Sequence, residues 1–398
     1  MPGEHRDLVA RDGTNLFNRN VSVVDGSGVK RWLPGVSKIR GVNLGSLFII
    51  EPWMSNTIWN NMGCGNSASE FDCVKLLGQD KANAAWAQHW DSFITQDDIK
   101  RMTSYGLNTI RVPVGYWMRE DIVDRSTEYF PEGGLAYLER LCGWASDAGL
   151  FIIIDLHGAP GAQQLNAFTG QVPAQVGFYN SNNYERALKF LEWMANMTHT
   201  NNKFRNVGML EVVNEPSNSP DNGESVRSNY YPQAFTRIRA VEKQLGLDQS
   251  HYLHIQMMDQ RWGSGDPNQY LTDKYFAAYD SHTYLKFSNT PVDQNTYITT
   301  SCNDDRSGSS PTIVGEFSMA VPDAEDWTPQ WNPTLSSNKE FYQRWFAALI
   351  TEYEKEVGWI FWTWKNDLGD LRWEYDAAVQ AGIIPKDLQS IYNKHVCG

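Results

Sequence analysis

Two glutamates in this sequence stand where apolar runs end. Residues 207–213 are apolar and stop at Asn214-Glu215-Pro216, and residues 311–318, PTIVGEFS, present Glu316. Each run is short, which predicts a buried strand. Two carboxyl groups facing each other across a cleft can share a reaction, because one donates a proton while the other, ionised, attacks carbon. Glycosidic bonds are broken by such a pair.

Other strand candidates also carry side chains that can bind or react. Along the chain these are Arg111, His157, Asn214, His282 and Tyr284. A single glutamate or histidine in such a place is more often a helix cap, an ion-pair partner or a satisfied core residue, but this combination favours one site. Arg111 is expected to hold the pKa of Glu316 low and so to favour it as the nucleophile. Glu215 is then the acid/base.

Eight strand candidates alternate with helical patterns. Strands are expected at residues 38–45, 108–115, 150–158, 207–215, 251–257, 277–284, 311–318 and 358–365. Helices are expected at residues 95–106, 135–149, 183–200, 233–246 and 338–355, with none defined between the sixth and seventh strands. This alternation predicts an α/β protein with a closed (β/α)8 TIM barrel, in which both glutamates face one mouth.

A doubly wound open sheet is the alternative fold, but no glycine-rich phosphate loop follows the first strand. No linker or internal repeat divides the chain. We therefore expect a single domain over residues 1–398, with residues 1–35 as an N-terminal extension packed on the barrel.

The composition disfavours several classes of partner. The chain has 398 residues, a formal net charge of −13 and 20% charged residues, which argues against nucleic acid and anionic membrane surfaces. No apolar run approaches the length of a membrane span. Aromatic residues make up 13%, including 16 Trp, and several of these lie in loop-like segments. Most rings are expected in the core, but flat rings exposed in a cleft stack well on the apolar faces of sugars.

The five cysteines help to predict whether the protein is secreted or cytosolic. Cys64 and Cys73 flank a polar loop and are expected to pair, while a bridge between Cys302 and Cys397 would tie down the C-terminus. Cys142 lies in a helical pattern and is expected to be a buried thiol. Two bridges favour a secreted, extracellular protein, whereas five reduced thiols would suit a cytosolic enzyme. The first residues are polar and lack a signal peptide's apolar segment, so a secretion signal would have been removed or replaced.

The motifs together resemble glycoside hydrolase family 5 of clan A, whose members are retaining enzymes built on a (β/α)8 barrel. The resemblance runs from about residue 39 to residue 397. It is carried by RGVNLGSLFIIEPWM, HWDSFITQDDIKRM, YGLNTIRVPVGYW, IIIDLHGAPGAQ, GMLEVVNEP, VGEFSMA and GWIFWTWK. Within the family the chain is most similar to fungal endo-β-1,6-glucanases and, more distantly, to fungal exo-β-1,3-glucanases.

The resemblance implies a role for each residue that matches a family motif. Glu215 of NEP matches the acid/base, and Glu316 of VGEF matches the nucleophile. Residues that match the lining of the reacting sugar's subsite are Arg111, His157, Asn214, His282 and Tyr284. Glu51 of EPW matches a position that binds glucose hydroxyls in the exo-glucanases. Either Trp362 or Trp364 matches the sugar platform, and Trp364 is favoured.

The implied reaction is endo cleavage of β-1,6-glucan, the pustulan-type polymer of fungal cell walls. The exo-glucanases carry HHHY where this chain has SHTY, and residues 62–73 and 166–179 look more like the β-1,6-glucanases. Alternatives are an exo-β-1,3-glucanase, a non-catalytic wall-glucan-binding protein, and a metal-dependent barrel hydrolase. Both carboxyls are present, and no third metal ligand has suitable spacing. No metal or organic cofactor is implied, and we expect a monomer that acts on β-glucan.

Overall fold

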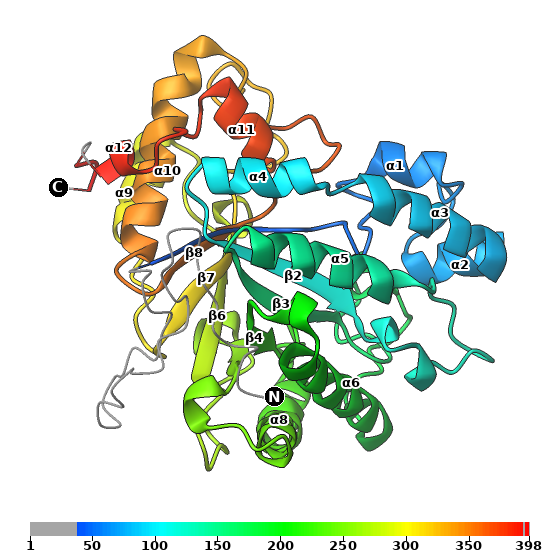
Figure 1. The fold of residues 1–398 in the computed structure, drawn as a ribbon. Coiled ribbons are helices and arrows are strands. Elements are labelled where there is room, and N and C mark those ends of the chain that lie inside the picture. Colours follow the sequence, from blue (N-terminus) through cyan, green and yellow to red (C-terminus); the bar gives the residue numbers. More distant parts are fainter. Residues whose placement is uncertain (1–37, 393–394, 398) are drawn as a thin grey trace.

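A computed structural model, which describes residues 38–392 and 395–397, shows eight parallel strands closed into a barrel (Figure 1). Each strand pairs with the next in sequence, and the last pairs with the first. The strands are β1 (Ile39–Asn43), β2 (Thr109–Gly115), β3 (Phe151–Gly158), β4 (Val207–Glu211), β5 (His254–Met258), β6 (Ala277–Thr283), β7 (Thr312–Phe317) and β8 (Gly358–Phe361). The predicted (β/α)8 barrel is confirmed, whereas the proposed N-terminal extension, residues 1–35, lies outside the described residues.

The side chains that face the barrel interior change from apolar to polar along each strand, as β3 shows. Its inward-facing positions are Phe151, Ile153, Asp155 and His157, because alternate residues of a strand share a face. The first two join a small apolar cluster inside the barrel, and the last two are buried polar groups. The interior is therefore apolar at the amino ends of the strands and charged at their carboxyl ends.

Twelve α-helices accompany the strands in the described part of the chain. They are α1 (Asn56–Asn61), α2 (Glu70–Leu77), α3 (Gln79–Ser92), α4 (Gln96–Ser104), α5 (Gly134–Asp147), α6 (Ser181–Thr200), α7 (Pro220–Ser225), α8 (Tyr231–Gln244), α9 (Gln294–Cys302), α10 (Lys339–Tyr353), α11 (Tyr375–Ala381) and α12 (Gln389–Tyr392). The five predicted helices correspond to α4, α5, α6, α8 and α10. The start of α4 has a local cause, since Thr95 and Asp98 form a reciprocal capping box.

Several elements differ from the prediction. Helices α1, α2 and α3 lie together beside the barrel in Figure 1, in a stretch for which no element was predicted. Helix α9 is rich in Thr, Ser and Asn, so its sequence shows little apolar periodicity. Strand β4 ends at Glu211 and β8 at Phe361, a few residues earlier than expected. The residues after these two strands belong to loops at the mouth of the barrel.

Both expected disulfides are present, and they link segments that lie outside the barrel strands. Cys64 bonds to Cys73, which lies on α2 rather than in a loop, and Cys302, the last residue of α9, bonds to Cys397. Cys142 is a buried free thiol on α5, as expected. None of the described helices combines the length and apolar character needed to cross a membrane.

Candidate active site

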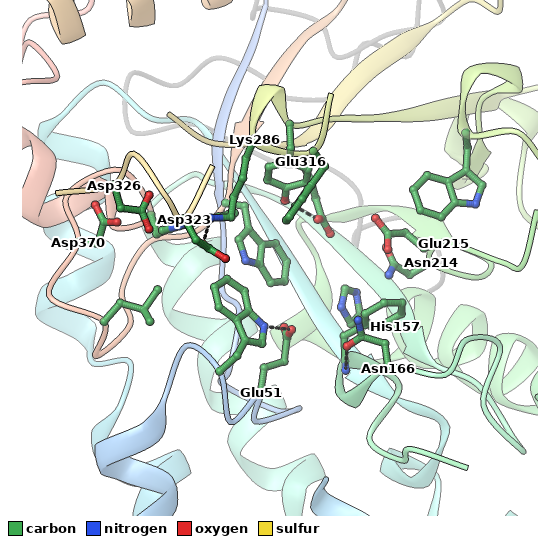
Figure 2. Close-up of a pocket in the computed structure, with 18 of the residues that line it drawn as sticks. Glu51, His157, Asn166, Asn214, Glu215, Lys286, Glu316, Asp323, Asp326 and Asp370 are labelled. Atoms are coloured by element: carbon green, nitrogen blue, oxygen red, sulfur yellow. Dashed lines mark hydrogen bonds and ion pairs between the residues drawn. The ribbon is translucent and has the colours of Figure 1, made fainter. Parts of the chain in front are cut away.

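A cavity of about 740 Å³ opens at the carboxyl ends of the strands. Its walls come from the loops that follow β1, β3, β4, β5, β6, β7 and β8. Among the predicted site residues, those that line it are Glu51, His157, Asn214, Glu215, Tyr284 and Glu316. Figure 2 shows Glu215 and Asn214 on one side and Glu316 near the centre. The two remaining polar candidates, Arg111 and His282, lie behind this lining and contact it.

The two glutamates from the opening motifs meet in this cavity. One carboxylate oxygen of Glu215 and one of Glu316 lie within 4.8 Å of each other. Glu316 is buried, with 5% of its surface exposed, and Glu215 is half-buried. Carboxyl groups about 5–5.5 Å apart are typical of retaining glycosidases, since a wider gap is needed to admit the water of an inverting enzyme.

The backbone at Glu215 is unusual. Its φ is 41°, a left-handed conformation that non-glycine residues rarely adopt and that costs roughly 1–2 kcal/mol. Hydrogen bonds hold the residues on either side of Glu215. The backbone N–H of Asn214 donates to the Leu156 carbonyl on β3, and the Pro216 carbonyl accepts from the Trp262 indole at 2.7 Å. These contacts fix the turn that directs the Glu215 carboxylate into the cavity.

A glycine precedes Glu316 for a steric reason. The Gly315 amide donates to the Asp280 carboxylate at 2.9 Å, and a Cβ at this position would clash with that carboxylate. Only glycine lets β7 pass so close to Asp280. In the VGEF motif, Gly315 therefore allows the backbone of β7 to approach Asp280, and this contact helps to position the carboxyl group of Glu316.

Two donors bind the Glu316 carboxylate. Arg111 Nη1 donates at 2.9 Å, and the Tyr284 hydroxyl donates at 2.8 Å. Burial raises the pKa of Glu316, and the positive charges of His282 and Arg111 oppose that rise without cancelling it. The expectation that Arg111 would hold this pKa low is therefore wrong in its net direction, because the depth of burial was not visible in the sequence.

Arg111 is the centre of a buried charge network beneath the cavity. Its guanidinium contacts Glu211 Oε2 at 2.7 Å, Asp155 Oδ2 at 3.1 Å and Asp280 Oδ2 at 3.4 Å, besides Glu316. Although burial opposes it, these carboxylates raise the pKa of Arg111 well above its usual value. Glu211 and Asp280 were not singled out from the sequence. The sequence could have indicated them by position, because Glu211 lies three residues before Asn214 and Asp280 lies two residues before His282.

Both predicted histidines are held by carboxylates. His157 Nδ1 lies 2.6 Å from Asp155, and its ring stacks on Trp362 with centroids 5.7 Å apart. Burial alone would lower the pKa of His282, but Glu316 and Asp280 raise it well above its usual value. The raised pKa favours the protonated ring, in which Nδ1–H donates to the Glu215 carboxyl at 2.7 Å.

Glu51 is a buried carboxyl on the floor of the cavity. The Trp53 indole donates to it at 2.8 Å, and burial raises the pKa of Glu51 to about 7. Near neutral pH this group exists in both protonation states, so it can either donate a hydrogen bond to a ligand hydroxyl or accept one. Glu51 lines the cavity, and its role in binding glucose hydroxyls stays a prediction from the EPW motif.

The choice between the two tryptophans is corrected by the structure. Trp364 is fully buried, donates to Asp98 on α4 and stacks on Tyr375, so it cannot contact a ligand in the cavity. Trp362 lines the cavity instead. Strand β8 ends at Phe361, and the chain that follows sends the two rings in different directions.

Among the residues that the structure describes, two groups of side chains have the spacing to hold a metal ion: Glu211, Asp280 and His282, and Glu215, His282 and Glu316. The shared member, His282, already contacts carboxylates through both ring nitrogens, Nδ1 with Glu215 at 2.7 Å and Nε2 with Asp280 at 3.4 Å. A metal ligand must be the neutral imidazole. A metal ion at either group would therefore have to displace a proton from the His282 ring.

Comparisons with known proteins place the chain in a family. The family model described as cellulase (glycosyl hydrolase family 5) matches residues 69–368. Glucan endo-1,6-beta-glucosidase B of Emericella nidulans is 59% identical over all of this chain and 96% of its own length. The protein named "Probable glucan 1,3-beta-glucosidase A" of Aspergillus clavatus is 29% identical, over 87% of each chain.

Solved structures support the fold. The rutinosidase from Aspergillus niger superposes with a TM-score of 0.68 at 19% identity, covering 87% of this chain and 97% of its own. A second structure, AoRut, gives a TM-score of 0.70 at 20% identity, over 89% and 98% of the two chains. The barrel, the paired carboxyls and the match over residues 69–368 lead to one assignment. The chain belongs to glycosyl hydrolase family 5.

Proposed function

We propose that this protein is a retaining endo-β-1,6-glucanase that cleaves pustulan-type β-glucan by double displacement. The observation that carries the proposal is the approach of a Glu215 oxygen to a Glu316 oxygen within 4.8 Å, in a cavity of this family's fold. The choice of linkage is supported by the 59% identity to a relative named for β-1,6 cleavage, against 29% for one named for β-1,3.

In the first step Glu316, as a carboxylate, attacks the anomeric carbon, and a glycosyl–enzyme ester forms. The bond from that carbon to the leaving oxygen breaks, and Glu215 transfers its proton to this oxygen. Glu215 suits the donor role because it is half-buried and open to the cleft, with only His282 bound to it, whereas Glu316 is buried and held by both Arg111 and Tyr284.

In the second step the deprotonated Glu215 takes a proton from water, whose oxygen attacks the anomeric carbon. The ester bond breaks and the Glu316 carboxylate is regenerated. Two inversions at one carbon restore the β configuration. No redox or metal step is needed, because protons and electron pairs move only between the two carboxyls, water and substrate.

Other predicted residues position the sugar in this scheme. Asn214 Oδ1 accepts from Arg111 at 2.8 Å, which orients the amide so that its nitrogen is available to a hydroxyl. His157 and Glu51 line the cavity with polar atoms, and Trp362 offers an aromatic face. We infer that these groups hold the reacting glucosyl unit over Glu316.

We also infer a secreted protein that acts as a monomeric single domain, consistent with two disulfides and an uncharged polysaccharide substrate. Nucleic acid and membrane partners remain disfavoured by the net charge of −13. An exo-β-1,3-glucanase is the second candidate, favoured only by the more distant relatives. A non-catalytic glucan-binding protein is disfavoured because both carboxyls are present and meet.

A direct assay separates these candidates. Pustulan and laminarin are offered side by side, and the products are followed over time. Oligomers released early from pustulan, with the β-anomer formed first by NMR, support the proposal. Faster glucose release from laminarin, with no oligomers from pustulan, would assign the exo-β-1,3 activity instead.

A further inference from the structure

The cavity extends well past the two carboxyls on one side. The loops after β6, β7 and β8 form this part, which we call the Trp327 wing: Lys286, Phe287, Asp323, Asp326, Trp327 and Asp370. Figure 2 shows Asp323, Asp326 and Asp370 across the cavity from Glu215, with Glu316 between them. The mechanism above uses none of these residues.

Trp327 is an exposed ring with a rigid support. Its side chain is 53% exposed, and the Arg372 guanidinium covers one face at 5.2 Å from the ring centroid. Arg372 is fully buried and is locked by hydrogen bonds to the Asp370 carboxylate and to the Asp326 carbonyl at 2.7 Å. One face of the indole is therefore fixed by the protein, while the ring borders the cavity.

Exposure of so large a ring to water is unfavourable, and an exposed apolar surface in a cleft usually marks a binding site. Phe287, 73% exposed, adds a second ring to the same wing. Both rings can gain free energy by covering the C–H face of a pyranose.

Polar groups beside the rings suit hydroxyls and disfavour anions. Asp323 pairs with Lys286, and Asp326 lies 3.4 Å from Arg372. Counting Asp370, the wing and its support hold three carboxylates and two cations, a net charge of −1. Carboxylates accept hydrogen bonds from hydroxyls and the ammonium donates to them. The surface therefore fits an uncharged, hydroxyl-rich chain.

The wing is continuous with the reacting centre. The Tyr284 ring, whose hydroxyl binds Glu316, lies 5.9 Å from the Phe287 ring and 5.6 Å from the Trp373 ring. Trp373 is the neighbour of Arg372 in sequence. Because Glu215 protonates the leaving oxygen, the departing part of the glucan lies on the Glu215 side. The wing is on the opposite side, where the retained part of the chain extends.

We propose that Trp327 is the stacking platform of a glucosyl subsite that binds the glucan on the nonreducing side of the reacting sugar. This inference rests on the proposed glucanase activity and adds to it the residue that lets the enzyme bind within a chain rather than at its end.

The test is the dependence of rate on chain length. Trp327→Ala is compared with the parent enzyme on β-1,6-gluco-oligosaccharides of increasing length and on dinitrophenyl β-glucoside, which has no sugar beyond the reacting one. We expect kcat/KM on long oligosaccharides to fall about tenfold, equal to ~1.4 kcal/mol, while the aryl glucoside is unaffected. Trp327→Phe should recover most of the loss.

A matched control exists on α5. Trp144 is a half-buried tryptophan with the Arg140 guanidinium 4.9 Å from its ring centroid, and it does not line the cavity. Trp144→Ala should leave every rate unchanged. If Trp327→Ala fails to fold, Trp327→Leu keeps apolar cover over Arg372 without a flat ring, and it should show the same selective loss on long substrates.

Two results would overturn the inference: equal losses on the aryl glucoside and the long oligosaccharides, or no loss on either. Failure of the proposed function has a different signature. If the parent enzyme cleaves another β-glucan in preference to pustulan, the linkage is wrong. The same length series made from the preferred glucan still decides the role of Trp327.

Discussion

His282 Nδ1 lies 2.7 Å from Glu215 Oε1, and the same nitrogen lies 3.5 Å from Glu316 Oε2. The His282 ring thus stands between two carboxyls that repel each other at this spacing when both are ionised. Its other nitrogen faces Asp280 at 3.4 Å, so the ring is held at both ends. The electrostatics of the two catalytic carboxyls therefore depend on His282 and on Arg111.

Glu316→Gln should abolish turnover while leaving the fold intact. The amide keeps the shape of the side chain, but it cannot form the glycosyl ester, so we expect a loss of about 10⁴-fold or more in kcat. Release of reducing sugar from pustulan measures the activity, and circular dichroism checks the fold. Substantial remaining activity would show that the nucleophile is another group.

Glu215→Gln should separate substrates by their leaving group. We expect a loss of roughly 10²–10⁴-fold on the polysaccharide, because the leaving oxygen no longer receives a proton. Dinitrophenyl β-glucoside needs little acid help, so its first step should remain fast. Stopped-flow detection of a dinitrophenol burst, followed by slow turnover, measures this difference. Equal losses on both substrates would contradict the acid/base role.

Arg111→Met should move the acid limb of the pH profile upward. The reaction needs ionised Glu316, and Arg111 lowers the pKa of this carboxyl against the effect of burial. Without the guanidinium charge that pKa rises, so activity is lost at a higher pH as the solution is acidified. The profile of kcat/KM against pH measures the shift, and Arg111→Lys, which keeps a charge, should show less of it. An unchanged or lowered limb would exclude this coupling.

The same Arg111→Met change should also destabilise the protein. Arg111 is fully buried between Asp155, Glu211 and Asp280, and its removal deprives Glu211 of its ion-pair partner while Asp155 and Asp280 keep only a histidine each as ion-pair partner. Loss of one partner of a buried ion pair costs about 3–5 kcal/mol of unfolding free energy. Urea unfolding followed by fluorescence gives this value, and a cost under ~1 kcal/mol would show that the network adapts.

The bridge between Cys302 and Cys397 should contribute strongly to stability. Its partners are 95 residues apart, and in the chain-entropy model a loop of that length is worth about 4–5 kcal/mol. We expect Cys302→Ala/Cys397→Ala to lower the unfolding free energy by that order. Cys142→Ala, which removes a buried thiol but no bridge, is the control. A loss no larger than the control's would mean that the bridge is structurally neutral.

A chelator should leave activity unchanged. Among the described residues, both side-chain groups with metal-like spacing contain His282, whose two ring nitrogens already contact the Glu215 and Asp280 carboxylates. The assay repeats pustulan hydrolysis after dialysis against EDTA. Activity that falls after dialysis and returns with a divalent cation would point to the metal-dependent alternative.

Much of the site could be predicted because the sequence motifs lie at the carboxyl ends of predicted strands. Alternation along β3 places Asp155 and His157 on one face, and the NEP and GEF motifs follow apolar strands. The tryptophans show the limit of that reasoning. Trp362 and Trp364 have the spacing of one strand face, but β8 ends before them, so one ring lines the cavity and the other packs beside α4.

The sequence by itself determined the barrel and the two candidate glutamates, because periodicity and motif identity are properties of short segments, whereas the disulfide pairing needed the structure. Only the tertiary structure decided which way the Glu316 pKa moves, how Arg111, Glu211 and Asp280 share charge, and that Trp327 rests on Arg372 beside the cavity. These properties depend on burial and on distances between residues far apart in the chain, and they are set by how the loops pack.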